Sequence, residues 1–301
     1  MYYLRSCSLW LAIGIGSFLW VPTAGAAPSS GPPSDARSEV ASASTVPPAA
    51  VAPLTNQPVT EDLLAKAREA AARMFNEVEN VICREDVKRF KSGRGGAEHQ
   101  VDVIQTQVTV ENGGERYTSV LQNNRKRNRM SDIGGAWSEG EYATFLGEAR
   151  QVLSSNRFIH TAYLADLNGV PATVFPFEVN QGDTSWDFKV SSHHYSLPFQ
   201  GELWVSSATG EVLRIRRIAR QVDPATGIAE VDWTVDFASI SIDGRTLSLP
   251  AKALYIVTYS RDQSRQWNAV SFSSYQHFGS DAMIRYNTPG SLETAVASPQ
   301  P

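Results

Sequence analysis

Cys83 is the residue of this 301-residue sequence whose type best suits covalent chemistry. It lies in the stretch NVICREDVKRF, and Cys7 is the only other cysteine in the sequence. A cysteine nucleophile needs a base beside it, and no histidine or oxyanion loop is written near Cys83. The motifs HExxH, GxSxG and the P-loop are absent as well. The sequence therefore predicts a noncatalytic protein in which Cys83 is a small buried hydrophobic residue. The alternatives are a reactive thiol, an intermolecular disulfide bridge, or a hydrolase.

The histidines do not form a metal-binding pattern. His193 and His194 are adjacent in SSHHYSLP, and neighbours on a strand point to opposite faces, so the pair would not chelate one metal ion. His99, His160 and His277 have no partners at a ligand spacing. We therefore predict neither a metal site nor a cofactor.

A dense basic run, NRKRNR, occupies residues 124–129 and contributes Arg125, Lys126, Arg127 and Arg129. The ordinary interpretation is a solvated loop or an edge strand. The functional interpretation is contact with an anionic lipid headgroup or a protein partner, because each basic residue near an anionic surface contributes about 1 kcal/mol. The chain carries a net charge of −4 and lacks the basic surface typical of nucleic-acid binding.

Large apolar side chains recur on the side of the predicted strands that turns inward. Packing in a hydrophobic core is the ordinary interpretation of this pattern. Large rings on a concave sheet also line pockets for apolar ligands. We therefore take seven residues as a candidate apolar pocket: Phe175, Phe177, Trp186, Phe188, Leu203, Trp233 and Phe237.

The stretch FQGELWVSSATGEVLRIRRIAR, residues 199–220, predicts two antiparallel strands around a short loop that ends at Gly210. Apolar residues alternate with charged ones, so one face of this hairpin is apolar. The predicted register pairs Leu203 with Ile215, Val205 with Leu213, Trp204 with Arg214 and Glu202 with Arg216.

Two neighbouring stretches also have strand patterns. In TVFPFEVNQGDTSWDFKV, a loop at Gly182 and Asp183 predicts a hairpin. Its register would place Phe177 opposite Phe188 and Val179 opposite Trp186. In EVDWTVDF, acids alternate with apolar residues, and we expect the acids to face Arg214 and Arg216 on the next strand.

Two amphipathic helices are predicted. The first spans about residues 61–79, where apolar residues recur at the spacing of one helical face after a capping Thr60. The second follows the stretch SEGE, in which Ser138 and Glu141 form a capping box ahead of an apolar stripe. Because one side of each helix is apolar, both helices must lie on another layer.

The whole pattern predicts an α+β fold that is mainly antiparallel β. About nine or ten strands would form a curved, open half-barrel, and the two amphipathic helices would cover its concave face. This single domain is expected at residues 59–286. Two helices cover only part of so wide a sheet, so its apolar face lines either a packed core or a cavity.

The two ends of the sequence differ from this domain. Residues 1–26 have the features of a secretory signal peptide: Arg5, an apolar run from Ser8 to Val21, and small residues up to Ala26. Residues 27–58 are rich in Pro, Ala and Ser and are predicted to be a disordered spacer, and residues 287–301 a flexible tail. We expect an exported protein, cleaved near Ala26 and located in the periplasm or outside the cell, with an uncleaved anchor as the alternative.

Several stretches resemble known families. GELWVSSATGEVLRI is similar to a hairpin of the periplasmic lipoprotein carriers, which sort outer-membrane lipoproteins, and of related envelope-stress sensor domains. The stretch GAWSEGEYATFL at 135–146, the same hairpin, and NAVSFSSYQHFGSDAMI at 268–284 resemble a family of uncharacterised exported bacterial proteins. The carrier resemblance implies a half-barrel that binds acyl chains in its concavity and passes them to a membrane-bound partner.

We therefore predict an exported, noncatalytic binding protein that holds an apolar ligand, a lipid or an acyl chain, between the sheet and the helices. A membrane-associated protein is the partner implied. The alternative is an envelope-associated structural or regulatory interaction module without a small ligand.

Overall fold

The computed structural model describes residues 7–12, 61–78, 81–93, 96–111, 114–155, 162–220 and 222–277. Most of the predicted signal peptide, the predicted spacer, the predicted tail and Thr60 lie outside these ranges. Within them, no helix is long and apolar enough to span a membrane.

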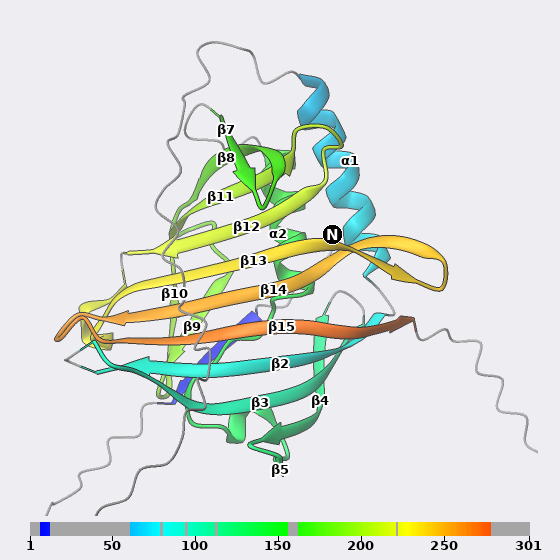
Figure 1. Cartoon of the computed structure of the whole chain (residues 1–301). Coiled ribbons are helices and arrows are strands. Elements are labelled where there is room, and N and C mark those ends of the chain that lie inside the picture. Colours follow the sequence, from blue (N-terminus) through cyan, green and yellow to red (C-terminus); the bar gives the residue numbers. More distant parts are fainter. Residues whose placement is uncertain are drawn as a thin grey trace, which may run out of the picture.

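One large sheet of eleven strands forms the body of the described chain (Figure 1). Its order is β5-β4-β3-β2-β15-β14-β13-β12-β11-β8-β7, with every neighbouring pair antiparallel, so β5 and β7 are edges and the sheet is open. The predicted fold class is confirmed, with eleven strands where about nine or ten were expected. The strands are β2 (Val81–Ser92), β3 (Glu98–Glu111), β4 (Gly114–Gln122), β5 (Arg125–Lys126), β7 (Tyr163–Leu167), β8 (Val170–Val179), β11 (Phe199–Ser206), β12 (Val212–Ala219), β13 (Ile228–Ile242), β14 (Arg245–Tyr259) and β15 (Arg265–His277).

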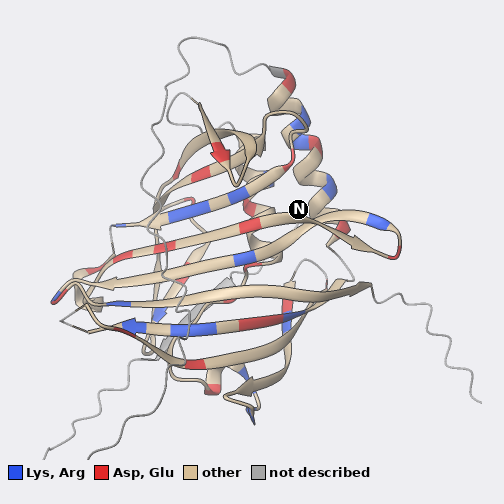
Figure 2. Cartoon of the chain, viewed as in Figure 1, with Lys and Arg blue, Asp and Glu red and all other residues tan. Residues whose placement is uncertain are grey.

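The two faces of the large sheet differ in polarity. Apolar residues on its inner face join one buried core. On the outer face, Arg214 lies 2.5 Å from Asp236 and Arg216 lies 2.7 Å from Asp232, as predicted from the alternation. Figure 2 shows charged residues spread along the strands rather than gathered at one end. Exposed ion pairs contribute little to stability, so burial of the inner face holds the sheet together.

A second layer covers the inner face of the large sheet (Figure 1). It contains α1 (Glu61–Glu77), α2 (Ala143–Ser155) and a four-stranded sheet of order β10-β9-β1-β6. The small sheet was not predicted, and it covers area that the two helices leave open. Its strands are β1 (Cys7–Ala12), β6 (Gly135–Ala136), β9 (Trp186–Val190) and β10 (His193–Ser196). Two short 3-10 helices, Met130–Asp132 and Pro224–Thr226, complete the described elements.

The two long helices pack against each other. Arg68 of α1 donates from Nε to the carbonyl of Leu153, at the end of α2, over 3.0 Å. The turn between β11 and β12 presses against α1 at Gly210, where an added Cβ would lie 2.6 Å from Lys66 Cβ. Gly210 also has a φ of +79°, so both the turn and the close approach require glycine.

The start of α2 differs from the prediction. Ser138 does donate a hydrogen bond to Glu141, but the helix begins later, at Ala143. The amides of Tyr142 and Ala143 donate instead to Oε1 of Glu115 on β4, over 2.8 and 2.7 Å. A carboxylate at a helix N-terminus is favourable, so a residue from the sheet replaces the predicted local cap.

The hairpin of β11 and β12 forms largely as predicted. Leu203 pairs with Ile215, and the pairs Trp204–Arg214 and Glu202–Arg216 are confirmed. The predicted pairing of Val205 with Leu213 is wrong: a β-bulge after Trp204 shifts the register, so that Val205 pairs with Val212. A bulge adds one unpaired residue and turns the following side chains to the other face.

The predicted hairpin of β8 and β9 is wrong. The edges of β8 pair with β7 and β11, whereas β9 leaves the large sheet and pairs with β10 and β1 in the second layer. Phe177 therefore lies opposite Gly201 rather than Phe188. Trp186, Phe188 and Lys189 are all buried, so β9 is covered on both of its faces. A strand buried on both faces has no polar side to indicate its layer.

Candidate ligand site around Arg217

Arg217 is a fully buried cation on the inner face of the large sheet. It lies on β12 between Ile215 and Ala219, whose side chains share its face, and it is only 1% exposed. Burying a guanidinium group costs several kcal/mol, on the order of a stable domain's whole margin, unless its charge and donors find partners. Its surroundings therefore decide what this region of the protein can do.

Four aromatic rings surround the Arg217 guanidinium. Its Cζ lies 4.1 Å from the ring centroid of Phe145, 4.4 Å from Trp186, 4.5 Å from Trp233 and 5.6 Å from Phe199. The rings come from α2, β9, β13 and β11, so both layers of the protein converge on this one cation. Cation–π attraction offsets part of the cost of burial, at about 2 kcal/mol for a desolvated contact.

Glu148 of α2 is the charged partner of Arg217. Arg217 Nη1 donates to Glu148 Oε2 over 2.7 Å, and the Glu148 side chain is 9% exposed. Burial raises the pKa of the Glu148 carboxyl above its ordinary value, although the charge and hydrogen bond of Arg217 oppose that rise. The carboxylate is thus held less firmly in its charged form than one at the surface.

Several polar atoms around this ion pair have no hydrogen-bond partner among the described residues. Arg217 Nε and Nη2 are two of them. The indole Nε1 atoms of Trp186 and Trp233, the hydroxyl of Tyr255 and Oε1 of Glu148 are others. Trp233 contacts both neighbouring rings, with centroids 5.9 Å from Trp186 and 5.6 Å from Tyr255. Most of these atoms are donors, so their shared chemistry favours an acceptor-rich, negatively charged group.

The space next to the ion pair is small in the described conformation. A cavity of about 10 Å³ lies between α2 and β8, lined among others by Glu148, Val152, Val179 and Phe199. That volume holds about one water molecule. A larger molecule does not fit into this space in the described conformation.

The seven predicted pocket residues all lie in the same buried core as this site. Trp186 and Trp233 face Arg217 directly. Phe177 packs edge-on against Phe199, with ring centroids 6.1 Å apart. Their role in ligand binding stays a prediction. The other four predicted pocket residues, which also belong to this core, are Phe175, Phe188, Leu203 and Phe237.

The predicted headgroup residues lie elsewhere. Arg125 and Lys126 form the edge strand β5, and Arg127 and Arg129 follow it, all four exposed. In the order of the large sheet, six strands separate β5 from β12, which carries Arg217. The structure thus does not bring the basic run together with the aromatic residues, and its contact with a headgroup or a partner stays a prediction.

Arg217 itself was missed in the sequence analysis. The signal was present in LRIRRIAR, because Arg217 has the same parity as Ile215 and Ala219, the two apolar residues that flank it on that face of the strand. A charged residue on the inward parity of an otherwise apolar strand face is the pattern that would have found it.

The other residues with catalytic potential do not form a site. Cys83 is buried and free, and burial raises the pKa of its thiol, which favours the unreactive protonated form. His193 and His194 lie on β10, and His194 Nδ1 is 2.8 Å from Asp187 Oδ2. Within the described ranges, no group of three potential metal ligands is close enough to hold an ion.

No protein-family model matches the chain, and no curated protein matches it. Three solved structures illustrate its architectural neighbours. A DUF1329 family protein from Desulfovibrio piger is 12% identical, covers 73% of this chain and 94% of its own, and has a TM-score of 0.34. A domain named after outer membrane lipoprotein-sorting proteins, from Vibrio parahaemolyticus, is 10% identical over 74% of this chain and 96% of its own, with a TM-score of 0.33.

The MucA/MucB complex of Pseudomonas aeruginosa supplies the third match, 10% identical over 68% of this chain and 92% of that one, with a TM-score of 0.19. The lipoprotein-sorting domain among these structures agrees with the resemblance predicted from the sequence.

Proposed function

We propose that this protein is an exported, noncatalytic binding protein that holds an apolar molecule with an anionic end between the large sheet and α2. The observation that supports it most is Arg217, a buried cation in an aromatic cage with two unpartnered donor nitrogens. We place the protein in the periplasm or outside the cell on the strength of its predicted signal peptide.

The energetics favour such a ligand. Each methylene group that leaves water contributes about 0.8 kcal/mol, and the core around Arg217 is lined with rings. A carboxylate or phosphate would accept charge-assisted hydrogen bonds from the unused nitrogens of Arg217. Because burial raises the pKa of Glu148, this side chain can take up a proton and leave the ion pair when an anion replaces it.

The alternative is an envelope-associated interaction module without a small ligand. The small volume of the cavity beside Glu148, about 10 Å³, favours it, because side chains of the protein itself fill most of this space. The two proposals differ in whether α2 opens to admit a molecule.

Titration with a fluorescent fatty acid and with the fatty alcohol of the same chain length tests the proposal. Wild-type protein should bind the acid at least about tenfold more tightly than the alcohol, a difference of about 1.4 kcal/mol. Arg217→Met should abolish that preference, because methionine keeps much of the volume and loses the charge. Arg214→Met is the matched control, since Arg214 lies on the outer face of the same strand. Equal binding of acid and alcohol by the wild type would contradict the proposal.

A further inference from the structure

A strand from the start of the chain lies inside the second layer. β1 (Cys7–Ala12) is an inner strand of the small sheet, between β9 and β6. It runs parallel to β9 over five residue pairs, from Cys7↔Trp186 to Leu11↔Val190. It runs antiparallel to β6, with Ala12 opposite Gly135. Figure 1 shows β1 as the blue strand behind the large sheet.

The position of β1 is notable because its residues belong to the predicted signal peptide. If export removes them, one edge of β9 and one edge of β6 lose their backbone partners. β9 is an interior strand, with Trp186, Phe188 and Lys189 all buried. Unpaired backbone groups are costly in the interior of a protein, so the gap between these edges requires an occupant.

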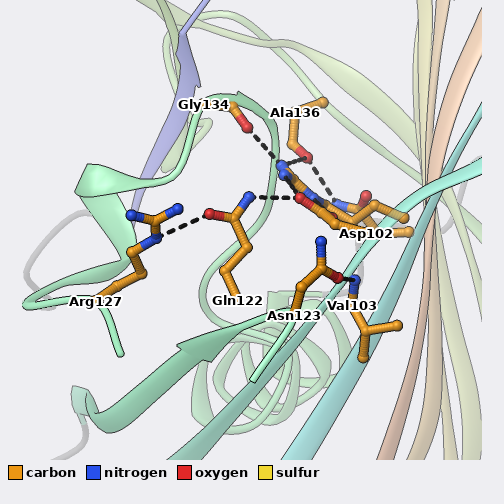
Figure 3. A network of polar contacts seen from close by, with 9 residues as sticks. Asp102, Val103, Gln122, Asn123, Arg127, Gly134 and Ala136 are labelled. Atoms are coloured by element: carbon orange, nitrogen blue, oxygen red, sulfur yellow. Dashed lines mark hydrogen bonds and ion pairs between the residues drawn. The ribbon is translucent and has the colours of Figure 1, made fainter. Parts of the chain in front are cut away.

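β6, which borders this gap on the side opposite β9, is held by a buried arginine. β6 is fixed by Arg89, whose Nη1 donates to the carbonyls of Gly134 and Ala136 over 2.7 and 3.3 Å (Figure 3). Arg89 is itself paired with the buried Asp102 through two hydrogen bonds of 2.6 and 2.5 Å. An added Cβ on Gly135, at a φ of +90°, would lie 3.1 Å from Arg89 Nη1, so the close approach favours glycine.

This network also reaches the basic run. Gln122 donates to Asp102 over 2.6 Å, and Arg127 donates to Gln122 over 2.9 Å (Figure 3). Gly135 and Ala136, which pair with β1, also line a cavity of about 260 Å³ together with Arg89 and Asn268. Hydrogen bonds from Arg89 to backbone carbonyls thus hold β6 in place on one side, and the edge of β6 on the other side pairs with β1.

We propose that the facing edges of β9 and β6 form a slot that binds an extended apolar segment of a partner polypeptide. In the chain that still carries the predicted signal peptide, the leader strand β1 occupies this slot. The segment that lies there, CSLWLA, indicates the kind of occupant: about six extended residues, mostly apolar and without proline. Strand addition takes affinity from backbone hydrogen bonds and selects side chains through the pockets on either side. This inference rests on the backbone of β9 and not on the charge of Arg217, although Trp186 of β9 also belongs to the aromatic cage.

The test uses the full chain made by cell-free synthesis, in which no peptidase removes the leader. A double variant, Leu9→Pro and Leu11→Pro, should vacate the slot, because proline cannot donate to a strand ladder. The probe is a fluorescein-labelled peptide with the sequence of residues 6–13, flanked by lysines for solubility. Its control carries proline at the two positions that correspond to Leu9 and Leu11.

The double variant should bind the probe saturably, and the wild-type full chain should bind it at least about tenfold more weakly, since its slot is filled. The proline-bearing peptide should bind neither chain. Failure of the probe to bind the variant, or equal binding by both chains, would overturn the proposal. So would displacement of the probe by a fatty acid, which would assign the slot to an acyl chain.

Hydrogen exchange provides a second measurement. In the double variant, the amides of Trp186–Val190 should exchange faster than in the wild type and recover when the probe is added. As a control, the amides of β13 and β14 should exchange as slowly in the double variant as in the wild type, which shows that the large sheet is folded. If the double variant loses this protection, the single variant Leu11→Pro replaces it, since Leu11 pairs with both neighbouring strands. Unchanged exchange in β9 would contradict a slot. Arg217→Met should leave probe binding intact, so this inference and the proposed function fail separately.

Discussion

Arg217 and Glu148 are buried together, but the two residues are not equivalent. Breaking a buried ion pair by removing one member costs about 3–5 kcal/mol, because the other charge is left behind. Arg217 keeps its charge at any ordinary pH. Glu148, whose pKa is raised by burial, can become neutral by taking up a proton when its partner is removed. Stability should therefore depend on which member is removed.

Glu148→Met should destabilise the protein by about 3 kcal/mol, because the Arg217 charge stays buried without a partner. Arg217→Met should cost less, and the double variant should recover most of the loss of Glu148→Met. Urea unfolding of the three variants measures the coupling. The control pair Arg214 and Asp236, which lies on the outer face, should couple by less than about 1 kcal/mol. Equal losses for the two single variants would show that Glu148 stays charged when Arg217 is absent.

Gly201 marks a tight contact in the core. An added Cβ there would lie 2.3 Å from Phe177 Cζ and 2.8 Å from the carbonyl oxygen of Arg216. Gly201→Ala should therefore destabilise the protein by about 1–3 kcal/mol through overpacking, as measured by urea unfolding. Gly182→Ala is the matched control, because nothing lies within 4 Å of its added Cβ. A neutral Gly201→Ala would mean that the Phe177 ring can move aside.

At the scale of elements, buried carboxyl groups gather where β2 and β4 meet the segment before α2. Glu85 and Glu141 are each 1% exposed, and both oxygens of Glu85 lack hydrogen-bond partners among the described residues. Burial raises the pKa of Glu141 to about 8, and the Glu115 carboxylate adds to the rise. Burial also raises the pKa of Glu85 well above its ordinary value. Both groups are therefore held protonated in the folded protein at mildly acidic pH.

The protein should lose stability as the pH rises from 5 to 8. Over this range the folded protein keeps protons on these carboxyls that the unfolded chain has already released, so the free energy of unfolding falls by up to about 1.4 kcal/mol per pH unit for each such group. The Tm measured across this range should fall accordingly. Glu141→Gln, which mimics the protonated acid, should reduce the slope, whereas Glu178→Gln on the exposed side of β8 should not. A Tm that rises between pH 5 and 8 would contradict the protonated state of this cluster.

The elements also show where sequence patterns suffice. The hairpin of β11 and β12 was predicted because a glycine turn joins two strands that each have one apolar and one polar face. The bulge after Trp204 was not predicted. β8 and β9 carry an equally good turn signal, but β9 is buried on both faces and pairs in another layer. The Glu115 cap of α2 comes from a strand more than twenty residues earlier in the chain, so no local pattern could have indicated it.

At the scale of the whole molecule, the open antiparallel sheet and its helices follow from alternation and helical spacing. The interior does not, because the small sheet fills area that two helices leave open. The predicted apolar residues are indeed gathered in one core, yet the cation beside them is Arg217 rather than the basic run at the β5 edge. The contact between Arg217 and the aromatic rings depends on how the second layer packs on the large sheet. The residues that determine this packing lie far apart in the sequence, so a local pattern does not predict it.

Native mass spectrometry of the protein purified from the cells that export it tests the central claim most directly. The wild type and Arg214→Met should carry a co-purified acidic, apolar molecule, identified after extraction, and Arg217→Met should carry much less of it. The same content in all three proteins, or none in the wild type, would contradict a buried anion site at Arg217.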